Sequence, residues 1–407
     1  MTAHFRAAVF ASLSLPLAAC LIAPLGGAFT HSPEEAAASL SPAAQALVAQ
    51  AWRDIPPGAA RDHHTHLLTL KTAVTGGYVH PHMLSWAHPV HRFKTAIYMS
   101  AAGVDDLEQA DGQYLERLTR LIRAIPGHGK HYILGFDQHY NVDGGVNAAK
   151  SEFYTPNDYA VQVAQRYPDL FIAAISVHPY RADALAELDR WGRRGVKLIK
   201  WLPNAQGMDA GDPRLDPYYA KVREYGMTIL THVGEEQAVE SQEDQRFGNP
   251  LLFRRPLDQG VKIIMAHGGS LGTDEDLDDP ARPRAPSYTL VLRLLREPQY
   301  RSLLLADISA MTQFNRLPEP LLAYLAASDI HPQLVNGSDY PLPAINALIR
   351  LDPLVDSGLL AAQDAAAIKE IYGYNPLLFD FVLKRRLRHP VTGAGFPASV
   401  FLARPEL

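Results

Sequence analysis

Cysteine is almost absent from this chain of 407 residues, in which Cys20 is the only one. A single thiol excludes a disulfide within the chain, and the length is sufficient to bury a large core in one α/β domain or in two smaller ones. Charge of one sign is not in excess either, because the net charge is −5 and the isoelectric point is near 6.4. This balance gives no electrostatic reason to expect a nucleic-acid partner. After the first twenty residues, no apolar run is long enough to span a bilayer.

The first twenty residues have the composition of an export signal. Arg6 precedes an apolar run from Ala7 to Ala19, and the run ends in Leu17-Ala18-Ala19-Cys20. This ending resembles the lipobox of bacterial lipoproteins, whose cysteine is lipidated and becomes the mature N-terminus. We therefore predict a lipoprotein-type signal over residues 1–19, an exported periplasmic or cell-surface protein, and membrane anchoring through a lipidated Cys20. The alternative is an ordinary cleaved signal with an incidental cysteine.

The rest of the chain is predicted to contain one large domain. Residues 20–58 are rich in Ala, Pro, Ser and Gly, and they predict a tether followed by one helix from about Pro33 to Trp52. Over residues 59–390, short β-rich runs alternate with helical patterns, which indicates a parallel sheet with crossover helices. Residues 391–407 are predicted to form a C-terminal tail.

The number of β-rich runs identifies the expected architecture. There are eight of them, which is the number that closes a (β/α)₈ TIM barrel. A long segment, residues 67–130, follows the first run and contains an expected helix at about 105–125. Insertions after the first barrel strand usually lie over the active-site mouth, so we expect this segment to act as a lid. The predicted runs are Arg61–His66, His131–His139, Phe171–His178, Val196–Trp201, Met227–His232, Val261–His267, Ser302–Ile308 and Leu334–Asp339.

The first run carries an unusual density of metal-binding side chains. The stretch Arg-Asp-His-His-Thr-His-Leu-Leu, residues 61–68, contains three histidines and an aspartate. His64 and His66 are two residues apart, and in a regular strand this spacing places both imidazoles on one face. Such a pair alone is a weak signal, because most His-x-His pairs are ordinary surface or core histidines.

Three later runs end in further side chains of the ligand type. His232 ends the fifth run, His267 the sixth and Asp339 the eighth. Because the carboxyl ends of parallel barrel strands meet at one rim, we expect these groups to converge with the two histidines of the first run. Imidazole together with carboxylate suits Zn²⁺ or a similar divalent ion, and leaves coordination positions open for water.

This order of residues resembles the amidohydrolase superfamily of metal-dependent hydrolases. Ala266-His267-Gly268-Gly269 and Gly337-Ser338-Asp339-Tyr340-Pro341 are particularly similar to the amidohydrolase-related branch, which also contains aminocarboxymuconate-semialdehyde decarboxylase-like enzymes. The resemblance extends over about residues 60–380. It implies that Asp339 binds metal and transfers protons, and that His267 binds a second metal or polarises the substrate. The residues that carry the resemblance are Asp62, His64, His66, Lys200, His232, His267 and Asp339, and it implies that His64, His66 and His232 are also metal ligands.

Lys200 bears on whether one or two ions are bound. The resemblance implies that in binuclear members a lysine on the fourth strand is carboxylated and bridges both metals, whereas mononuclear members lack this bridge. By strand parity, Lys200 shares the inward face with Leu198, and Lys197 falls on the opposite face. We favour the carbamate, because an inward ammonium would be repelled by a metal ion. The alternative is an ammonium that pairs with Asp62, Glu235 or an acidic substrate.

The predicted activity is metal-assisted hydrolysis of an amide, ester or lactone bond in a small molecule. Asp339 would accept a proton from the attacking water and pass it to the leaving group, and His267 would help to stabilise the oxyanion. Two alternatives are a non-oxidative metal-dependent decarboxylase on the same barrel and a non-catalytic metal-binding surface lipoprotein. The candidates for substrate binding are His139, His178, Arg181, which could instead pair with the helix after it, and Glu235, which with Glu236 could orient ligand histidines. The expected lid contains His80, His82, His88 and His91, which could close over the site or bind an adventitious ion, although we expect most of them to be solvated.

Overall fold

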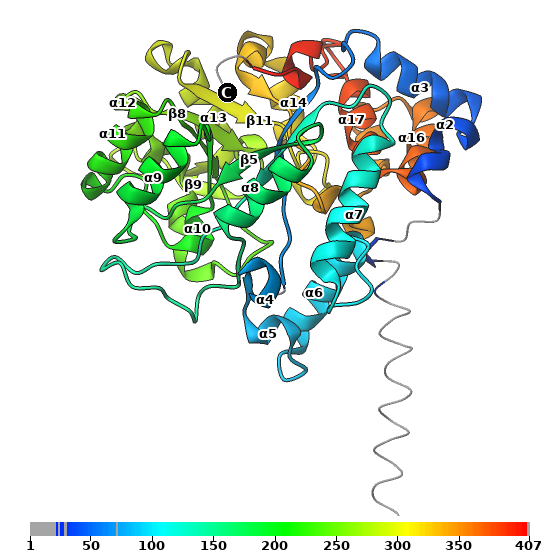
Figure 1. The fold of residues 1–407 in the computed structure, drawn as a ribbon. Helices are drawn as coiled ribbons and strands as arrows, with labels where there is room; N and C mark the ends of the chain where they lie inside the picture. The colour runs from blue at the N-terminus through cyan, green and yellow to red at the C-terminus, as the bar shows by residue number, and fades with distance from the viewer. Residues whose placement is uncertain (1–21, 23–24, 28–30, 71, 405–407) are drawn as a thin grey trace, which may run out of the picture.

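Eight parallel strands form the centre of the fold (Figure 1). The computed structural model describes residues 22, 25–27, 31–70 and 72–404, so the predicted signal and Cys20 lie outside the described residues. The sheet order follows the chain without exception, and all eight predicted runs become its strands. These strands are β1 (Arg61–His66), β3 (Lys130–Leu134), β5 (Phe171–Ile175), β6 (Leu198–Trp201), β7 (Thr228–His232), β8 (Lys262–Ala266), β11 (Leu304–Asp307) and β12 (Leu334–Val335).

The first and last strands meet and nearly close the sheet into a barrel. Thr65 forms a parallel bridge with Tyr340, and the His63 amide donates to the Asn336 carbonyl at 2.9 Å. This confirms the predicted (β/α)₈ arrangement. The helices of the described residues are α2 (Ala36–Ser39), α3 (Pro42–Trp52), α4 (Thr72–Thr75), α5 (Pro81–Leu84), α6 (Pro89–Ala101), α7 (Ala110–Arg123), α8 (Asn157–Arg166), α9 (Ala184–Arg193), α10 (Pro203–Gln206), α11 (Asp216–Glu224), α12 (Arg254–Asp258), α13 (Ser287–Arg296), α14 (Glu319–Ala326), α15 (Asp352–Asp356), α16 (Ala362–Tyr374) and α17 (Pro376–Arg386).

Apolar side chains alternate between the inside of the barrel and the helices around it. In β6, Leu198 packs with the interior of the barrel, whereas Ile199 and Trp201 belong to the core between the sheet and the helices. The alternation is the two-residue period of a strand, and it directs Lys200 inward. The interior residues are Tyr132, Leu134, Ala174, Leu198, Leu230, Ile264, Ala266 and Val335.

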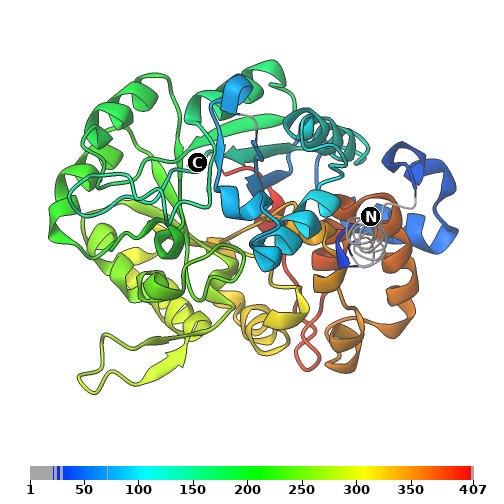
Figure 2. The same cartoon turned by 90° about the horizontal axis from the view of Figure 1, so that it is seen from below.

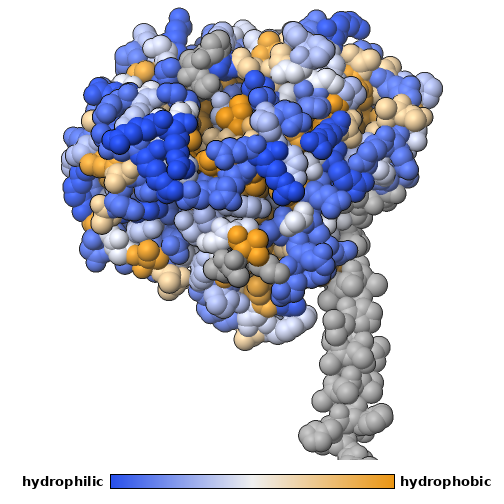
Figure 3. Space-filling view, viewed as in Figure 1, coloured by the Kyte–Doolittle hydropathy of each residue, from blue (hydrophilic) through white to orange (hydrophobic). Residues whose placement is uncertain are grey.

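The segment between β1 and β3, hereafter the β1–β3 connection, covers one end of the barrel. It contains α4 to α7, together with β2 (Tyr78–Val79), which pairs with β4 (Phe153–Tyr154). Viewed from below, its blue and cyan helices lie across the barrel end (Figure 2). Apolar side chains interrupt the mostly hydrophilic surface over α4 to α6 (Figure 3), where Val74, Trp86 and Val90 are largely exposed. The predicted helix at about 105–125 corresponds to α7.

The predicted boundaries of one helix and three strands were wrong. The single helix expected over Pro33 to Trp52 is divided, because Leu40 is extended and Ser41 begins α3 by accepting the Ala44 amide, while the Glu370 carboxylate binds Ser41. The second, third and eighth strands also end three to five residues earlier than predicted, so the residues after them, including Asp339, lie in loops.

The residues after α17 pack under the barrel. The 3₁₀ helix Ala398–Phe401 buries Val400 and Phe401 completely, and the Val400 carbonyl accepts the Asn336 amide beside β12. These contacts cover the end of the barrel opposite the strand carboxyl ends. No helix among the described residues is long and apolar enough to cross a membrane.

Candidate metal centre

His64 and His66, at the end of β1, lie around one carboxylate of the barrel rim. The Nε2 atom of His66 is 2.9 Å from Asp339 Oδ1, and the Nε2 atom of His64 is 3.4 Å from the same oxygen. The two ring centroids are 5.2 Å apart, although the pairing of β1 with β3 shifts register between Asp62 and Thr65. Side chains from opposite ends of the barrel sequence therefore converge on one point.

This arrangement has the dimensions that a divalent ion requires. With Zn–N bonds of 2.0–2.1 Å and tetrahedral angles, ligand atoms lie about 3.4 Å apart and the centroids of two bound imidazoles about 5 Å apart. The donor distances of 2.9 and 3.4 Å and the centroid distance of 5.2 Å match these values. His64, His66 and Asp339 are thus one of two sets of described residues that could hold a metal ion, the other being His64, His267 and Asp307, and Zn²⁺ is compatible with this chemistry.

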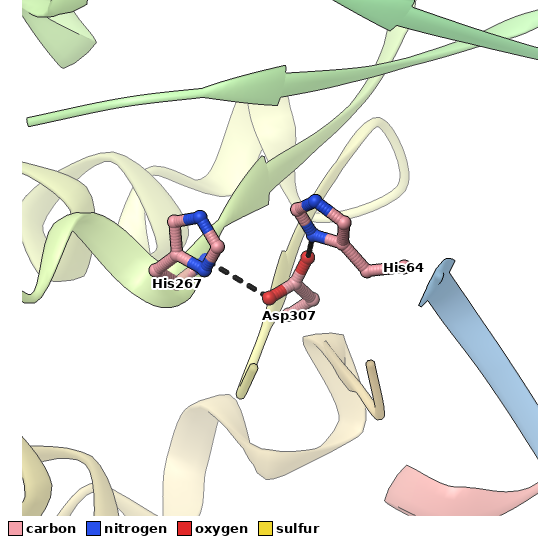
Figure 4. Close-up of side chains that lie close together, drawn as sticks. All are labelled: His64, His267 and Asp307. Carbon is pink, nitrogen blue, oxygen red and sulfur yellow. Dashed lines mark hydrogen bonds and ion pairs between the residues drawn. The ribbon is translucent and has the colours of Figure 1, made fainter. Parts of the chain in front are cut away.

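A second buried carboxylate, Asp307 at the end of β11, holds His64 from behind. Its Oδ2 is 2.9 Å from His64 Nδ1, while its Oδ1 accepts the backbone amide of His267 at 2.9 Å (Figure 4). A carboxylate on Nδ1 fixes the ring and leaves Nε2 unprotonated and directed at an ion. Our sequence analysis missed Asp307, although the same criterion of a ligand-type residue at a strand end, applied to the seventh run, would have identified it.

His267 follows β8 in a backbone conformation that few side chains adopt. Its φ is +57°, and the next two residues, Gly268 and Gly269, are also left-handed. The turn brings His267 Nε2 to 3.8 Å from Asp339 Oδ2, with Nδ1 2.8 Å from Ser309 Oγ. A Cβ at Gly268 would lie 2.5 Å from Met311 and Tyr324 atoms, so glycine is required here.

Asp339 also has a positive φ, of +61°. Its amide donates to the His64 carbonyl at 2.6 Å, which ties the loop after β12 to β1. At Gly337 the two strands approach so closely that a Cβ would lie 2.6 Å from the His64 Cβ. Left-handed backbone at non-glycine residues costs free energy and is concentrated at functional sites, and here it occurs at both predicted catalytic residues.

His232, at the end of β7, borders the same space. Its ring centroid is 5.2 Å from that of His267, and its Nδ1 is 3.3 Å from Glu236 Oε2. Its Nε2 lies 3.3 Å from the Glu235 carbonyl. The Glu236 side chain is thus placed to orient His232, whereas the exposed Glu235 side chain interacts with Gln237 and contributes its backbone oxygen.

Lys200 completes the wall of the site. It is 1% exposed, and its Nζ is 2.9 Å from His64 Nε2. Asp62, one of the alternative partners, is engaged elsewhere, because its Oδ1 accepts the amides of His64 and Ser338. Burial lowers the pKa of Lys200 to about 8, although the charges of nearby carboxylates such as Asp339 oppose this shift.

The protonation states favour cation binding. Burial alone would raise the pKa of Asp339, but the interactions of its carboxylate with His64, His66 and Lys200 outweigh burial and lower the pKa overall. Burial lowers the pKa of His232 to about 4, and that of His267 falls well below its ordinary value for the same reason. Near pH 7 the site therefore presents a carboxylate at Asp339 and neutral imidazoles at His232 and His267, which are the forms that bind metal.

These residues form the polar floor of a cavity of about 300 Å³, hereafter the barrel cavity. Its walls are largely apolar and come in part from the β1–β3 connection, including Met83, Tyr98 and Met99. Arg316 also lines it, is 8% exposed, and donates from Nη1 to Ser270 Oγ, while its Nε has no hydrogen-bond partner among the described residues. A buried guanidinium with a free donor is suited to an anionic group of a ligand. No sequence signal identified Arg316.

The four predicted substrate-binding residues do not line the barrel cavity. His178 is buried with Nε2 on the Gln206 carbonyl, and Arg181 pairs with Asp137 and Asp183, the alternative that we considered for it. His139 lines a neighbouring cavity, and the exposed Glu235 side chain is turned away. The loops after β3 and β5 place His139, His178 and Arg181 beyond the rim. Asn157 contributes to this placement at the end of β5. Its side-chain amide donates to the Ser176 carbonyl and accepts the Ser176 backbone amide, so that β5 ends there.

Comparison with known proteins agrees with this site. The sequence profile of the family described as "Amidohydrolase" matches residues 62–300, which is more than half of the chain. The chain belongs to the amidohydrolase family. The match begins at the Asp62-x-His64-x-His66 motif and includes Lys200, His232 and His267. A search of curated proteins finds no match.

Solved structures resemble this amidohydrolase only distantly. They include an uncharacterised TIM-barrel protein from Bordetella bronchiseptica (16% identity, 77% of this chain and 99% of that one, TM-score 0.47). A proposed 2-pyrone-4,6-dicarboxylic acid hydrolase from Pseudomonas putida has 17% identity over 84% and 97% of the chains, with a TM-score of 0.42. The 5-carboxyvanillate decarboxylase from Sphingomonas paucimobilis has 13% identity over 76% and 98%, with a TM-score of 0.44.

Proposed function

We propose that this amidohydrolase hydrolyses an amide, ester or lactone bond of a small molecule. The observation that carries the proposal is the position of Asp339. This buried carboxylate shares one point with His64 and His66 and forms the floor of a largely apolar cavity. Such a cavity suits a compact organic molecule whose reactive bond lies at its polar end.

The proposed metal centre would be held by His64, His66 and Asp339, with His232 and His267 beside them. A divalent ion there, of which Zn²⁺ is the best candidate, would make water a better nucleophile near neutral pH and polarise the scissile carbonyl. Asp339 is positioned to accept the proton of the attacking water and to return it to the leaving group.

His267 and Arg316 are proposed to act on the substrate. His267 Nε2 lies 3.8 Å from Asp339 Oδ2, so its ring can reach an oxygen bound next to the carboxylate. Because burial and the charge of Arg316 keep the pKa of His267 low, the ring is a neutral donor or a second ligand rather than a cation. Arg316 offers a buried positive charge to a carboxylate of the substrate or to a developing oxyanion.

We also propose that Lys200 carries a carbamate. A lysine with a pKa of about 8 is partly an uncharged amine near neutral pH, and it is this form that reacts with CO₂. The anionic product would remove the conflict between an ammonium and a cation beside His64. Carbon-13 NMR of protein equilibrated with labelled bicarbonate should show a carbamate signal that Lys200→Gln lacks. The same signal in the variant would contradict the assignment.

Decarboxylation is the second candidate, and Arg316 is the observation that favours it. A buried guanidinium in the same cavity as the proposed metal centre, with Nε unpartnered among the described residues, would hold a carboxylated substrate well. A panel of lactones, esters, dipeptides and aromatic carboxylates, assayed for acid release and for CO₂, separates the two reactions. Metal-dependent acid release supports the hydrolase, and CO₂ release supports the decarboxylase. If chelator-treated and metal-restored protein were equally inactive on every compound, the enzymatic proposal would fail.

Export and lipid anchoring are a further part of the proposal. They are supported by the apolar run after Arg6 and by the sequence Leu17-Ala18-Ala19-Cys20. Metabolic labelling with an alkyne fatty acid should label the wild-type protein in the membrane fraction but not the Cys20→Ala variant. Equal labelling of both proteins would exclude Cys20 as the lipidation site.

A further inference from the structure

A second cavity lies beside the barrel cavity, between the β1–β3 connection and the loops beyond β3 and β7. Its volume is about 350 Å³, and we name it the connection cavity. Met83 and Glu152 line both cavities, so the two are neighbours. The catalytic proposal uses none of its ionisable side chains, which are His80, His82, His91, His139, Lys150, Glu152, Glu240, Glu243 and Asp244.

Histidines of the β1–β3 connection are grouped along one wall. The ring centroids of His80 and His82 are 4.3 Å apart, and those of His82 and His91 are 6.4 Å apart. These distances lie on either side of the separation of about 5 Å expected for two imidazoles on one ion. The ring of His88 stacks on that of His82 with a centroid distance of 3.6 Å. Four imidazoles are therefore concentrated in the short segment that runs from His80 to His91, at the start of α6.

The opposite wall offers an imidazole without hydrogen bonds. His139 is 6% exposed, and neither of its ring nitrogens has a hydrogen-bond partner among the described residues. Asp244 Oδ2 lies 3.5 Å from His139 Nε2, at the limit of hydrogen-bond distance. A buried polar group without a partner is destabilising unless a ligand satisfies it. The Nδ1 atom of His139, which has no partner among the described residues, is therefore a second observation that supports a ligand in this cavity.

The charges in the cavity favour a cation. Four carboxylates line it, and Lys150 is the single lysine or arginine among its lining residues, with its Nζ 2.9 Å from both Glu243 and Asp244. With neutral imidazoles the cavity has a net negative charge. Imidazole nitrogens and carboxylate oxygens together form the ligand set that first-row divalent transition metals prefer.

We propose that the connection cavity binds a divalent transition-metal ion of its own, held by His80, His82 and His91 on one wall. His139 and Asp244 would complete the coordination from the other wall. No three of these side chains bring ligand atoms within 4.8 Å of one another in the described conformation, as the barrel residues do. Binding therefore requires rotation of the imidazoles, which the exposed His82 can do at little cost. The ion would join the β1–β3 connection to the barrel beside the barrel cavity.

Metal content is the primary test. Full-length protein is dialysed against buffered free Zn²⁺, and bound zinc is measured by elemental mass spectrometry. We expect His82→Gln/His91→Gln to hold one ion per chain fewer than the wild type. The control His31→Gln/His128→Gln removes two histidines that line neither cavity and should hold the wild-type amount. Equal zinc in the wild type and His82→Gln/His91→Gln would overturn the proposal.

Trp86 provides a second readout that is independent of the barrel centre. It is 68% exposed and lies between His82 and His88 in the sequence, whereas Trp191 and Trp201 are fully buried. In protein carrying His64→Asn/His66→Asn, which lacks barrel ligands, one equivalent of Cu²⁺ should quench the Trp86 emission. Adding His82→Gln/His91→Gln should abolish that quenching, and Trp86→Phe should remove the emission that responds. Quenching that survives the loss of His82 and His91 would overturn the site and leave the proposed barrel chemistry unaffected.

Discussion

The molecule contains two groups of histidines that differ in how their rings are held. In the barrel, His64 is fully buried and Asp307 binds its Nδ1, while Ser309 and Glu236 hold His267 and His232. In the β1–β3 connection, His82 is exposed and its ring contacts are other histidines such as His80 and His88. The barrel group has ligand atoms at the distances that an ion requires, whereas the imidazoles of the connection group must rotate before they can share an ion.

Fixed rings are expected of a catalytic centre, whereas loose rings are sufficient for a site that only binds an ion. A fixed ring loses no conformational freedom when an ion arrives, and it can place a substrate within tenths of an ångström. Loose rings must be ordered by the ion, so their affinity is lower and their geometry adapts to the metal. We therefore expect substitutions in the barrel group to change catalysis and metal affinity strongly, and substitutions in the connection group to change metal content alone.

The largest effect is expected from Asp339→Asn. The amide keeps the shape but cannot accept a proton, so kcat on the best substrate of the panel should fall by about 10³-fold or more. His64 and His66 remain, and much of the bound metal should therefore remain. Steady-state kinetics and metal analysis check both statements. Asp244→Asn in the connection cavity is the matched control, and its kcat should stay within a factor of a few of the wild type.

Asp307→Asn tests whether the support behind His64 matters. Loss of the charged partner on Nδ1 should weaken zinc binding by about 10- to 100-fold, the usual cost of removing a carboxylate behind a ligand histidine. Competition with a chromophoric chelator measures the dissociation constant. An unchanged constant would mean that the fixed ring is not what distinguishes the barrel group.

Gly337→Ala should disturb the barrel centre from the backbone side. The added Cβ would meet His64 Cβ at 2.6 Å, and overpacking of this kind lowers the free energy of unfolding by about 1–3 kcal/mol. Urea denaturation measures the change. Gly112→Ala in α7 is the control, because a Cβ there meets nothing within 4 Å and should stabilise the helix by about 0.5–1 kcal/mol. An unchanged free energy of unfolding in Gly337→Ala would show that the backbone at Gly337 does not pack tightly against His64.

The buried histidines outside the centre should make stability depend on pH. Burial lowers the pKa of His178 to about 3, compared with an ordinary value of 6.5. Between these values the unfolded chain binds a proton that the native protein does not, so stability falls as the pH drops below 6.5, by about 1.4 kcal/mol per unit for this residue. In His178→Gln, the slope of the unfolding free energy against pH, measured by urea denaturation, should decrease by this amount.

Tyr140→Phe is the control for that measurement. The Tyr140 ring is 5.0 Å from the ring of His178, and burial raises the pKa of its hydroxyl above the ordinary value, so it does not titrate below pH 7. The slope of the unfolding free energy against pH in Tyr140→Phe should match that of the wild type. A flattened slope in Tyr140→Phe would attribute the pH effect to packing and not to the imidazole.

The sequence predicted the barrel well because each signal was local. Strand parity alone placed Lys200 inward beside Leu198, and the eight runs appear in the sheet in their predicted order. The ends of strands were harder to predict, because Asn157 ends β5 through contacts made by a side chain nineteen residues away. His178 was therefore placed at the rim in the prediction but is buried beyond it. Arg316 could not be found, since its position depends on the loop after β11 and not on any repeating pattern.

The most direct test of the barrel centre is a crystal structure with anomalous data collected on both sides of the zinc absorption edge. The account predicts a peak in the anomalous difference map within bonding distance of His64 Nε2, His66 Nε2 and Asp339 Oδ1. A zinc-loaded crystal without a peak between these three atoms would contradict it.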